Sequence, residues 1–96
     1  MLDKLAIEDF AQHVGHRFGI STATATISLE LVSATPLRGH HASPRSGFSL
    51  LFRGVMTPTL AQCTHRIMHP ARGDMDIFLV PIGPDEVGMR YEAIFN

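Results

Sequence analysis

The sequence predicts a mainly β domain, a small six-stranded antiparallel barrel or sandwich with one N-terminal α-helix. Three observations support this fold class. Six segments are rich in β-branched and aromatic residues and show apolar–polar alternation or a short apolar run. Short connections with Gly or Pro separate most of them. Helical periodicity is confined to the N-terminus. Short antiparallel strands in this number form a small barrel or a two-layer sandwich.

The closing hairpin is the clearest pair of predicted strands. Ile77-Phe78-Leu79-Val80-Pro81-Ile82 is a continuous apolar run, and residues 89–95 alternate between polar and apolar. The segment between them, Gly83–Gly88, contains Pro84-Asp85, which suits the centre of a turn. We expect the apolar run to be buried on both faces. A hairpin alone cannot do this, so the rest of the chain must supply a sheet and a covering helix.

An amphipathic helix is predicted over residues 4–13. Leu2, Ala6, Phe10 and Val14 fall in one row on a 3.6-residue wheel. Phe10 is the main anchor of this row, Asp3 a candidate N-cap and Gly15 a candidate stop. A helix this short must dock on an apolar surface to be stable.

The remaining strands follow from alternation in the middle of the chain, and the whole chain, 1–96, reads as a single domain. The six predicted strands span about 16–22, 24–33, 48–53, 62–69, 75–82 and 89–95. The side chains expected in the core are Phe10, Phe18, Leu29, Leu31, Phe48, Leu50, Phe52, Phe78, Val80, Tyr91 and Phe95.

Composition restricts the class of protein. No apolar run approaches the ~20 residues of a membrane span. The N-terminus shows no apolar signal segment. The single cysteine, Cys63, excludes an internal disulfide framework and suits a reducing compartment. We therefore expect no membrane partner and a cytoplasmic location at synthesis.

A long loop, residues 35–47, is the predicted partner-binding region. Its sequence, TPLRGHHASPRSG, combines prolines, glycines, histidines and arginines. Residues 31–73 carry five arginines and no Asp or Glu. Loops on a rigid β scaffold commonly carry recognition, and arginine is enriched at interfaces. The predicted partner-binding residues are Arg38, His40, His41, Arg45, Arg53 and Arg66.

The six histidines raise the question of a metal site. His65 and His69 share a predicted strand face, but their Cα atoms lie ~13 Å apart in extended backbone. Cys63 and His65 are closer, yet no second pair with ligand spacing accompanies them. The histidines therefore predict no metal site and no cofactor, and dialysis against EDTA is expected to change nothing.

Catalytic and nucleic-acid functions find little support. Cys63 and His65 form a thiol–imidazole pair, but the sequence shows no third residue to orient them. No phosphate-binding glycine motif is present. The aromatic residues fall on predicted core faces, so they offer no stacking platform for nucleic acid. No catalytic residue is assigned, and an enzyme of unknown reaction with a pocket near Cys63 and His65 remains the alternative.

Several short segments together resemble a family of short bacterial proteins, the DUF6916 type, over nearly the full chain. They are Asp9-Phe10, His13-Val14-Gly15, Phe18, Phe48–Gly54, Gln62, His69-Pro70, Phe78–Gly83 and Tyr91–Asn96. Cys63 and His65 depart from the pattern, in which a glycine and an aromatic residue are more usual.

The resemblance implies an accessory or assembly role. No activity is assigned to the family, and the resemblance implies members that are encoded near phage-tail-like or tail-collar-type fibre proteins. We therefore expect a small non-catalytic protein-binding domain whose partner is a protein of that kind or a second copy of the chain. Neither a nucleic acid nor a membrane is expected as a partner.

Overall fold

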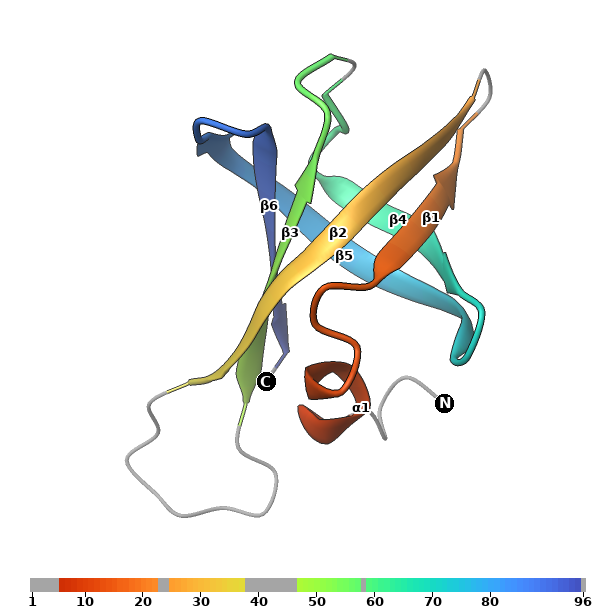
Figure 1. Ribbon diagram of the computed structural model, residues 1–96, viewed down its shortest axis with the longest axis vertical. Helices are drawn as coiled ribbons and strands as arrows, with labels where there is room; N and C mark the ends of the chain where they lie inside the picture. The colour runs from red at the N-terminus through yellow and green to blue at the C-terminus, as the bar shows by residue number, and fades with distance from the viewer. Residues whose placement is uncertain (1–5, 23–24, 38–46, 58, 96) are drawn as a thin grey trace.

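Six antiparallel strands form a closed barrel in the computed structural model, which describes residues 6–22, 25–37, 47–57 and 59–95 (Figure 1). The strands are β1 (Arg17–Ser21), β2 (Thr26–Pro36), β3 (Phe48–Gly54), β4 (Cys63–His69), β5 (Gly73–Pro84) and β6 (Met89–Phe95). Their order round the barrel is β1-β2-β3-β6-β5-β4. The predicted mainly β class is confirmed, and of the two predicted architectures the barrel is the correct one.

β2 and β5 continue past their predicted ends, and each contains a local irregularity that lets it bend. β2 continues to Pro36, with a register shift between Leu31 and Ser33. β5 begins at Gly73 and continues to Pro84, with a second shift between Pro81 and Gly83. An extra residue in one strand increases its twist and curvature, which lets a long strand follow a small barrel.

The barrel interior is filled by the inward-facing residues of all six strands and by Phe10 and Leu60. Alternation predicts most of them correctly, as in β2, where Ile27, Leu29 and Leu31 are buried. The buried apolar residues are Phe10, Phe18, Ile20, Ile27, Leu29, Leu31, Phe48, Leu50, Phe52, Leu60, Ile67, Met75, Ile77, Leu79, Tyr91 and Ala93.

Phe78 is an exception to the predicted core. Its neighbours Ile77 and Leu79 point inward, so strand alternation directs Phe78 to the outer surface, where it is 51% exposed. Val80 and Phe95 are only partly buried. The expectation that the apolar run is buried on both faces is therefore wrong, because no described element covers Phe78 on the outer face of β5.

The two ends of the barrel are closed by different segments. At one end lies α1 (Glu8–Ala11), whose Phe10 ring centroid is 5.9 Å from that of Phe48 and 5.7 Å from that of Phe95. At the other end, where β3 leads into β4 (Figure 1), the N–H of Leu60 donates to the Tyr91 hydroxyl at 2.8 Å. The predicted helix, 4–13, is thus longer than α1, and residues 4, 5 and the candidate cap Asp3 lie outside the described residues.

The barrel closes through the pairing of β1 with β4, which we call the seam. This ladder pairs only Gly19 with Met68 and Ile20 with Ile67. By contrast, β3 pairs with β6 along its whole length, from Phe48 to Gly54. The seam is therefore the shortest ladder of the barrel.

Among the described residues, no helix has the length and apolar character needed to cross a membrane.

Candidate functional site

Of the predicted partner-binding residues, only Arg53 and Arg66 lie in the described part of the chain. Arg38, His40, His41 and Arg45 fall outside it. The guanidinium of Arg53 lies 2.8 Å from the Asp85 carboxylate and 3.7 Å from that of Glu30. Arg66 pairs with Asp76 at 2.9 Å. Both guanidinium groups therefore already have acidic partners within the barrel.

Arg53 and Arg66 do not share one surface. They lie on β3 and β4, which are three strand positions apart in either direction round the barrel. A single partner would have to reach round the barrel to contact both. The predicted loop 35–47 starts later than expected, because Thr35 and Pro36 belong to β2 and pair with Ser49 and Phe48 of β3. Binding by this loop stays a prediction, since its central residues are outside the described structure.

Cys63 and His65 are adjacent in space but do not form an activated thiol. Sγ of Cys63 lies 3.4 Å from Nε2 of His65. The same Nε2 lies 2.7 Å from the carbonyl oxygen of Ala61. A carbonyl can only accept, so Nε2 carries the ring proton and has no lone pair with which to deprotonate the thiol. His65 in this arrangement therefore does not serve as the base for the exposed thiol of Cys63.

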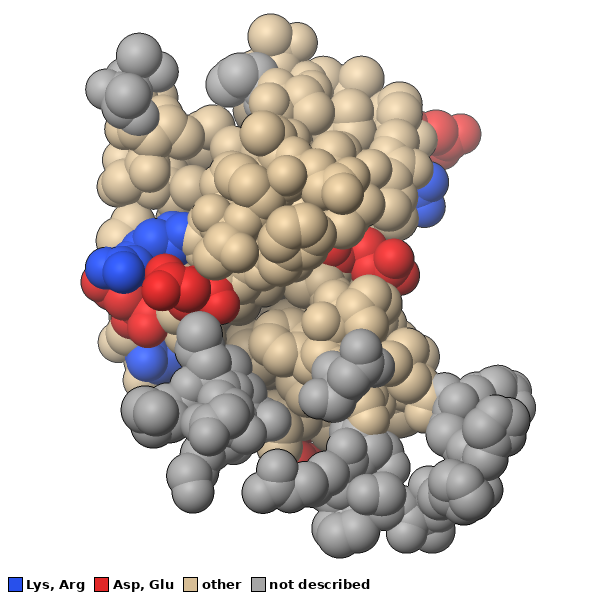
Figure 2. Space-filling view, turned by 180° about the vertical axis from the view of Figure 1, so that it is seen from behind, with Lys and Arg blue, Asp and Glu red and all other residues tan. Residues whose placement is uncertain are grey.

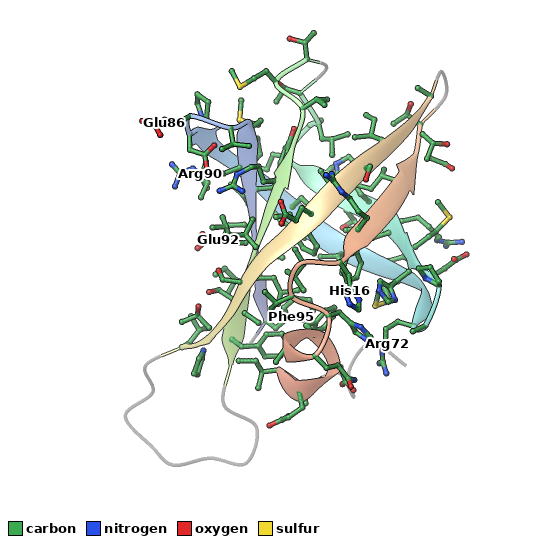
Figure 3. The ribbon with its side chains drawn as sticks, in the orientation of Figure 1. His16, Arg72, Glu86, Arg90, Glu92 and Phe95 are labelled. Atoms are coloured by element: carbon green, nitrogen blue, oxygen red, sulfur yellow. The ribbon has the colours of Figure 1, made fainter. Side chains whose placement is uncertain are left out.

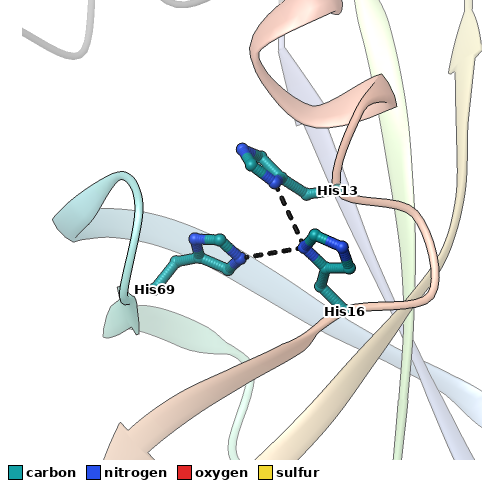
Figure 4. Close-up of side chains that lie close together, drawn as sticks. All are labelled: His13, His16 and His69. Atoms are coloured by element: carbon teal, nitrogen blue, oxygen red, sulfur yellow. Dashed lines mark hydrogen bonds between the residues drawn. The ribbon is translucent and has the colours of Figure 1, made fainter.

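A cluster of three histidines forms beside the helix end of the barrel. His13 follows α1, His16 directly precedes β1, and His69 ends β4 (Figures 3 and 4). The turn between the first two depends on Gly15, whose φ of +90° is a left-handed conformation that glycine adopts readily. The N–H of Gly15 donates to the carbonyl of Leu31 at 2.7 Å, which attaches this turn to β2.

The ring nitrogens of the cluster converge. Nδ1 of His16 lies 3.2 Å from Nδ1 of His13 and 3.3 Å from Nε2 of His69, as Figure 4 shows. One nitrogen from each ring lies within 4.8 Å of the other two. His13 and His69 are buried, whereas His16 is exposed, so the cluster has one side open to solvent.

The surroundings of His69 disfavour its charged form. Burial lowers the pKa of the His69 imidazole, and the neighbouring His13, His16 and Arg72 lower it further. The ring also packs on Phe18, with centroids 4.6 Å apart. A neutral imidazole is the form that binds a metal ion.

Hydrogen bonds define the arrangement of protons in the neutral cluster. The N–H of Ala71 donates to Nδ1 of His69 at 3.0 Å. A neutral His69 therefore carries its proton on Nε2 and donates it to Nδ1 of His16. Nδ1 of His16 has a single lone pair, so its 3.2 Å contact with Nδ1 of His13 can only share that acceptor.

Comparison with known proteins identifies the family. A model of a domain of unknown function, DUF6916, matches residues 5–95. The chain belongs to this family. No curated protein and no solved structure matches the chain. The resemblance predicted from short sequence segments is thus confirmed.

The DUF6916 domain also has an open groove of about 410 Å³ away from these histidines. Its lining includes Arg17, Thr26, Glu30, Arg53, Val55 and Val87. Arg53 and Glu30 are the ion pair described above. The groove does not include Cys63 or His65, so it adds no support for a reaction at those residues.

The histidine cluster of the DUF6916 domain is not evident from spacing along the chain, because His69 is far in sequence from His13 and His16. His65 and His69, which are close in the chain, have different partners: His65 contacts the carbonyl of Ala61, and His69 contacts His16. The combination of His69 with His13 and His16 joins residues 53 and more positions apart. The spacing of His13 and His16 across a helix end was the one local signal available.

Proposed function

We propose that this DUF6916 domain is a small non-catalytic protein-binding domain that serves as an accessory or assembly partner of a larger protein. The observation that supports the proposal best is the exposure of two large apolar side chains, Phe78 and Ile94, on the outer faces of the paired strands β5 and β6; we call these two side chains the apolar strip. Phe78 points outward from β5 and is 51% exposed, and Ile94 points outward from β6 and is 48% exposed. Exposed aromatic side chains are frequent anchors of protein interfaces.

The surroundings of the strip resemble the polar rim of an interface. Further along the outward row of β5 lie Asp74 and Asp76, which are exposed, and Val80 pairs in register with Glu92 of β6. Glu92 and Arg90 extend from the outer side of β6 in Figure 3. Viewed from behind, in Figure 2, charged side chains lie at the edges of a broad area without Lys, Arg, Asp or Glu. Apolar centres with polar rims are typical of protein interfaces.

The partner class follows from the family resemblance rather than from the surface. We propose a phage-tail-like or fibre-type protein, with the strip as its main contact and the loop 35–47 as a second contact. Self-association through the same strip is the other arrangement that an apolar outer face supports.

Site-specific photo-cross-linking tests the proposal. A benzophenone amino acid replaces Phe78 in one variant and Asp74 in another. Both positions are on the outer face of β5, so the second variant is a matched control. The proposal predicts that, in cells that make the natural partner, the residue at position 78 captures one defined protein and the residue at position 74 does not.

The captured species distinguishes the alternatives. A fibre-type protein supports the proposed partner, and a second copy of the chain indicates self-association. A third variant carries the benzophenone amino acid at His40. If this variant captures a protein and the position 78 variant does not, binding is assigned to the loop and the strip is not part of the interface. Absence of any captured protein at all three positions would contradict a protein-binding function.

A further inference from the structure

We propose that His13, His16 and His69 bind one late first-row transition-metal ion, most commonly Zn²⁺. The expectation of no metal rested on pairs of histidines that are near in sequence. The folded chain instead joins a helix-end pair to the last residue of β4. This site is independent of the apolar strip proposed above.

The distances between the ring nitrogens suit such an ion. Zn²⁺ binds histidine nitrogen at about 2.0–2.1 Å, which in a tetrahedron separates neighbouring nitrogens by about 3.3 Å. The two short separations in the cluster are 3.2 Å and 3.3 Å. All three donor atoms lie within 4.8 Å of one another, so small ring rotations complete one face of a tetrahedron.

The donor chemistry indicates the kind of metal. All three donors are imidazoles, which suit Zn²⁺, Cu²⁺ and Ni²⁺, whereas Mg²⁺ and Ca²⁺ prefer oxygen. The nearby Arg72 lies 3.4 Å from the Asp9 carboxylate, which offsets its positive charge next to the cluster. Because His16 faces solvent, a fourth position remains for water or another exchangeable ligand.

Metal binding requires one identifiable rearrangement. Nδ1 of His69 accepts the N–H of Ala71, and Nε2 therefore holds the proton in the metal-free protein. To bind the ion through Nε2, the ring must carry its proton on Nδ1, which breaks the contact with Ala71. Ligating histidines usually donate from their second nitrogen, so His69 must change its hydrogen-bond partner.

The position of the cluster suggests what the ion does for the fold. His16 immediately precedes β1 and His69 ends β4, the two strands that meet at the seam. An ion held by both would link these strands beyond the point where their backbone pairing stops. Metal binding is then expected to stabilise the seam, since a ligand that binds only the folded state increases its stability.

Titration of the untagged, metal-free protein tests the proposal. Zn²⁺ binding is followed by calorimetry, and Co²⁺ serves as a spectroscopic probe whose visible absorption reports tetrahedral coordination. We expect one ion per chain, no binding of Mg²⁺ or Ca²⁺, and a higher melting temperature with Zn²⁺. In NMR spectra, the Ala71 amide should shift and the His69 proton should move from Nε2 to Nδ1.

Two kinds of variant separate the cluster from the other histidines. His16→Asn removes an exposed ligand, so the fold should persist. The Zn²⁺ affinity should fall by at least about 100-fold, which is more than the loss of a residue that only hydrogen-bonds to a metal ligand costs. His65→Gln and the double variant His40→Gln/His41→Gln should bind like the unaltered protein.

Three outcomes would overturn the assignment. One is the absence of Zn²⁺ and Co²⁺ binding by the unaltered protein. Another is unchanged affinity in His16→Asn. The third is loss of binding in the His40/His41 double variant alone, which would assign the metal to the loop instead.

Discussion

Asp85 shows how one side chain organises the turn between β5 and β6. One carboxylate oxygen accepts the N–H of Val87 at 2.8 Å and of Gly88 at 2.9 Å. The other accepts from Arg53 of β3. These contacts lower the pKa of Asp85 from 3.8 to about 2, the two backbone hydrogen bonds being the larger causes. The folded protein therefore favours the ionised form of the Asp85 carboxylate.

The first prediction concerns the pH dependence of this contribution. Because the pKa is lower in the folded state, Asp85 stabilises the fold fully above its ordinary pKa, and this contribution is lost as the pH falls toward about 2. Asp85→Asn should therefore be less stable than the unaltered protein near neutral pH. The difference should shrink as the pH falls below about 4.

Urea denaturation at several pH values measures this difference. Glu86→Gln is the matched control, because it removes the same charge from the same turn without altering the Asp85 contacts. If the deficit of Asp85→Asn is constant down to the lowest pH, ionisation of Asp85 contributes nothing to folding and only the shape of its side chain matters.

At the scale of one element, β5 separates an inner from an outer row. Ile77 and Leu79 are buried, whereas Phe78 between them is half exposed. The same strand thus contributes to the core on one face and to the proposed interface on the other. Size and hydrophobicity alone do not distinguish these positions, since all three residues are large and apolar.

The second prediction compares neighbours on β5. Leu79→Ala should lower the free energy of unfolding by about 2–5 kcal/mol, the usual cost of a cavity in a packed core. Phe78→Ala should cost about 1 kcal/mol or less, because surface positions tolerate substitution. Chemical denaturation of both variants provides the comparison. A larger loss for Phe78→Ala than for Leu79→Ala would mean that β5 is turned the other way.

For the whole molecule, the unequal lengths of the strand ladders determine where the barrel opens most readily. The seam between β1 and β4 pairs two positions on each strand, whereas β3 and β6 pair throughout. Few backbone hydrogen bonds join the strands at the seam, so local opening there breaks less structure than opening elsewhere.

The third prediction is that the seam opens first. In native-state hydrogen exchange of the metal-free protein, amides that bond across the seam should exchange about 10-fold faster or more than those between β3 and β6. Two-dimensional NMR resolves the individual amides. Equal protection of both ladders would show that the barrel opens only as a unit, and would leave a metal ion nothing to stabilise selectively at the seam.

Local sequence patterns are sufficient to predict the strands and most of the core. Alternation is a local property of extended backbone, so residues such as Leu29, Leu31 and Phe52 could be assigned to the interior from their spacing alone. The same holds for Phe10 as the anchor of the helix. The family resemblance rested on the same local segments and needed no knowledge of the fold.

Three features depend on contacts between segments that are far apart in the chain. The tertiary structure closed the barrel, because pairing of β1 with β4 joins strands far apart in sequence. It exposed Phe78, because whether the outer face of β5 is covered depends on what the other elements reach. It also brought His69 to His13 and His16. Spacing along the chain governs contacts within a helix or strand, but only the closed barrel determines which strand ends meet. The histidine cluster lies where the start of β1 meets the end of β4.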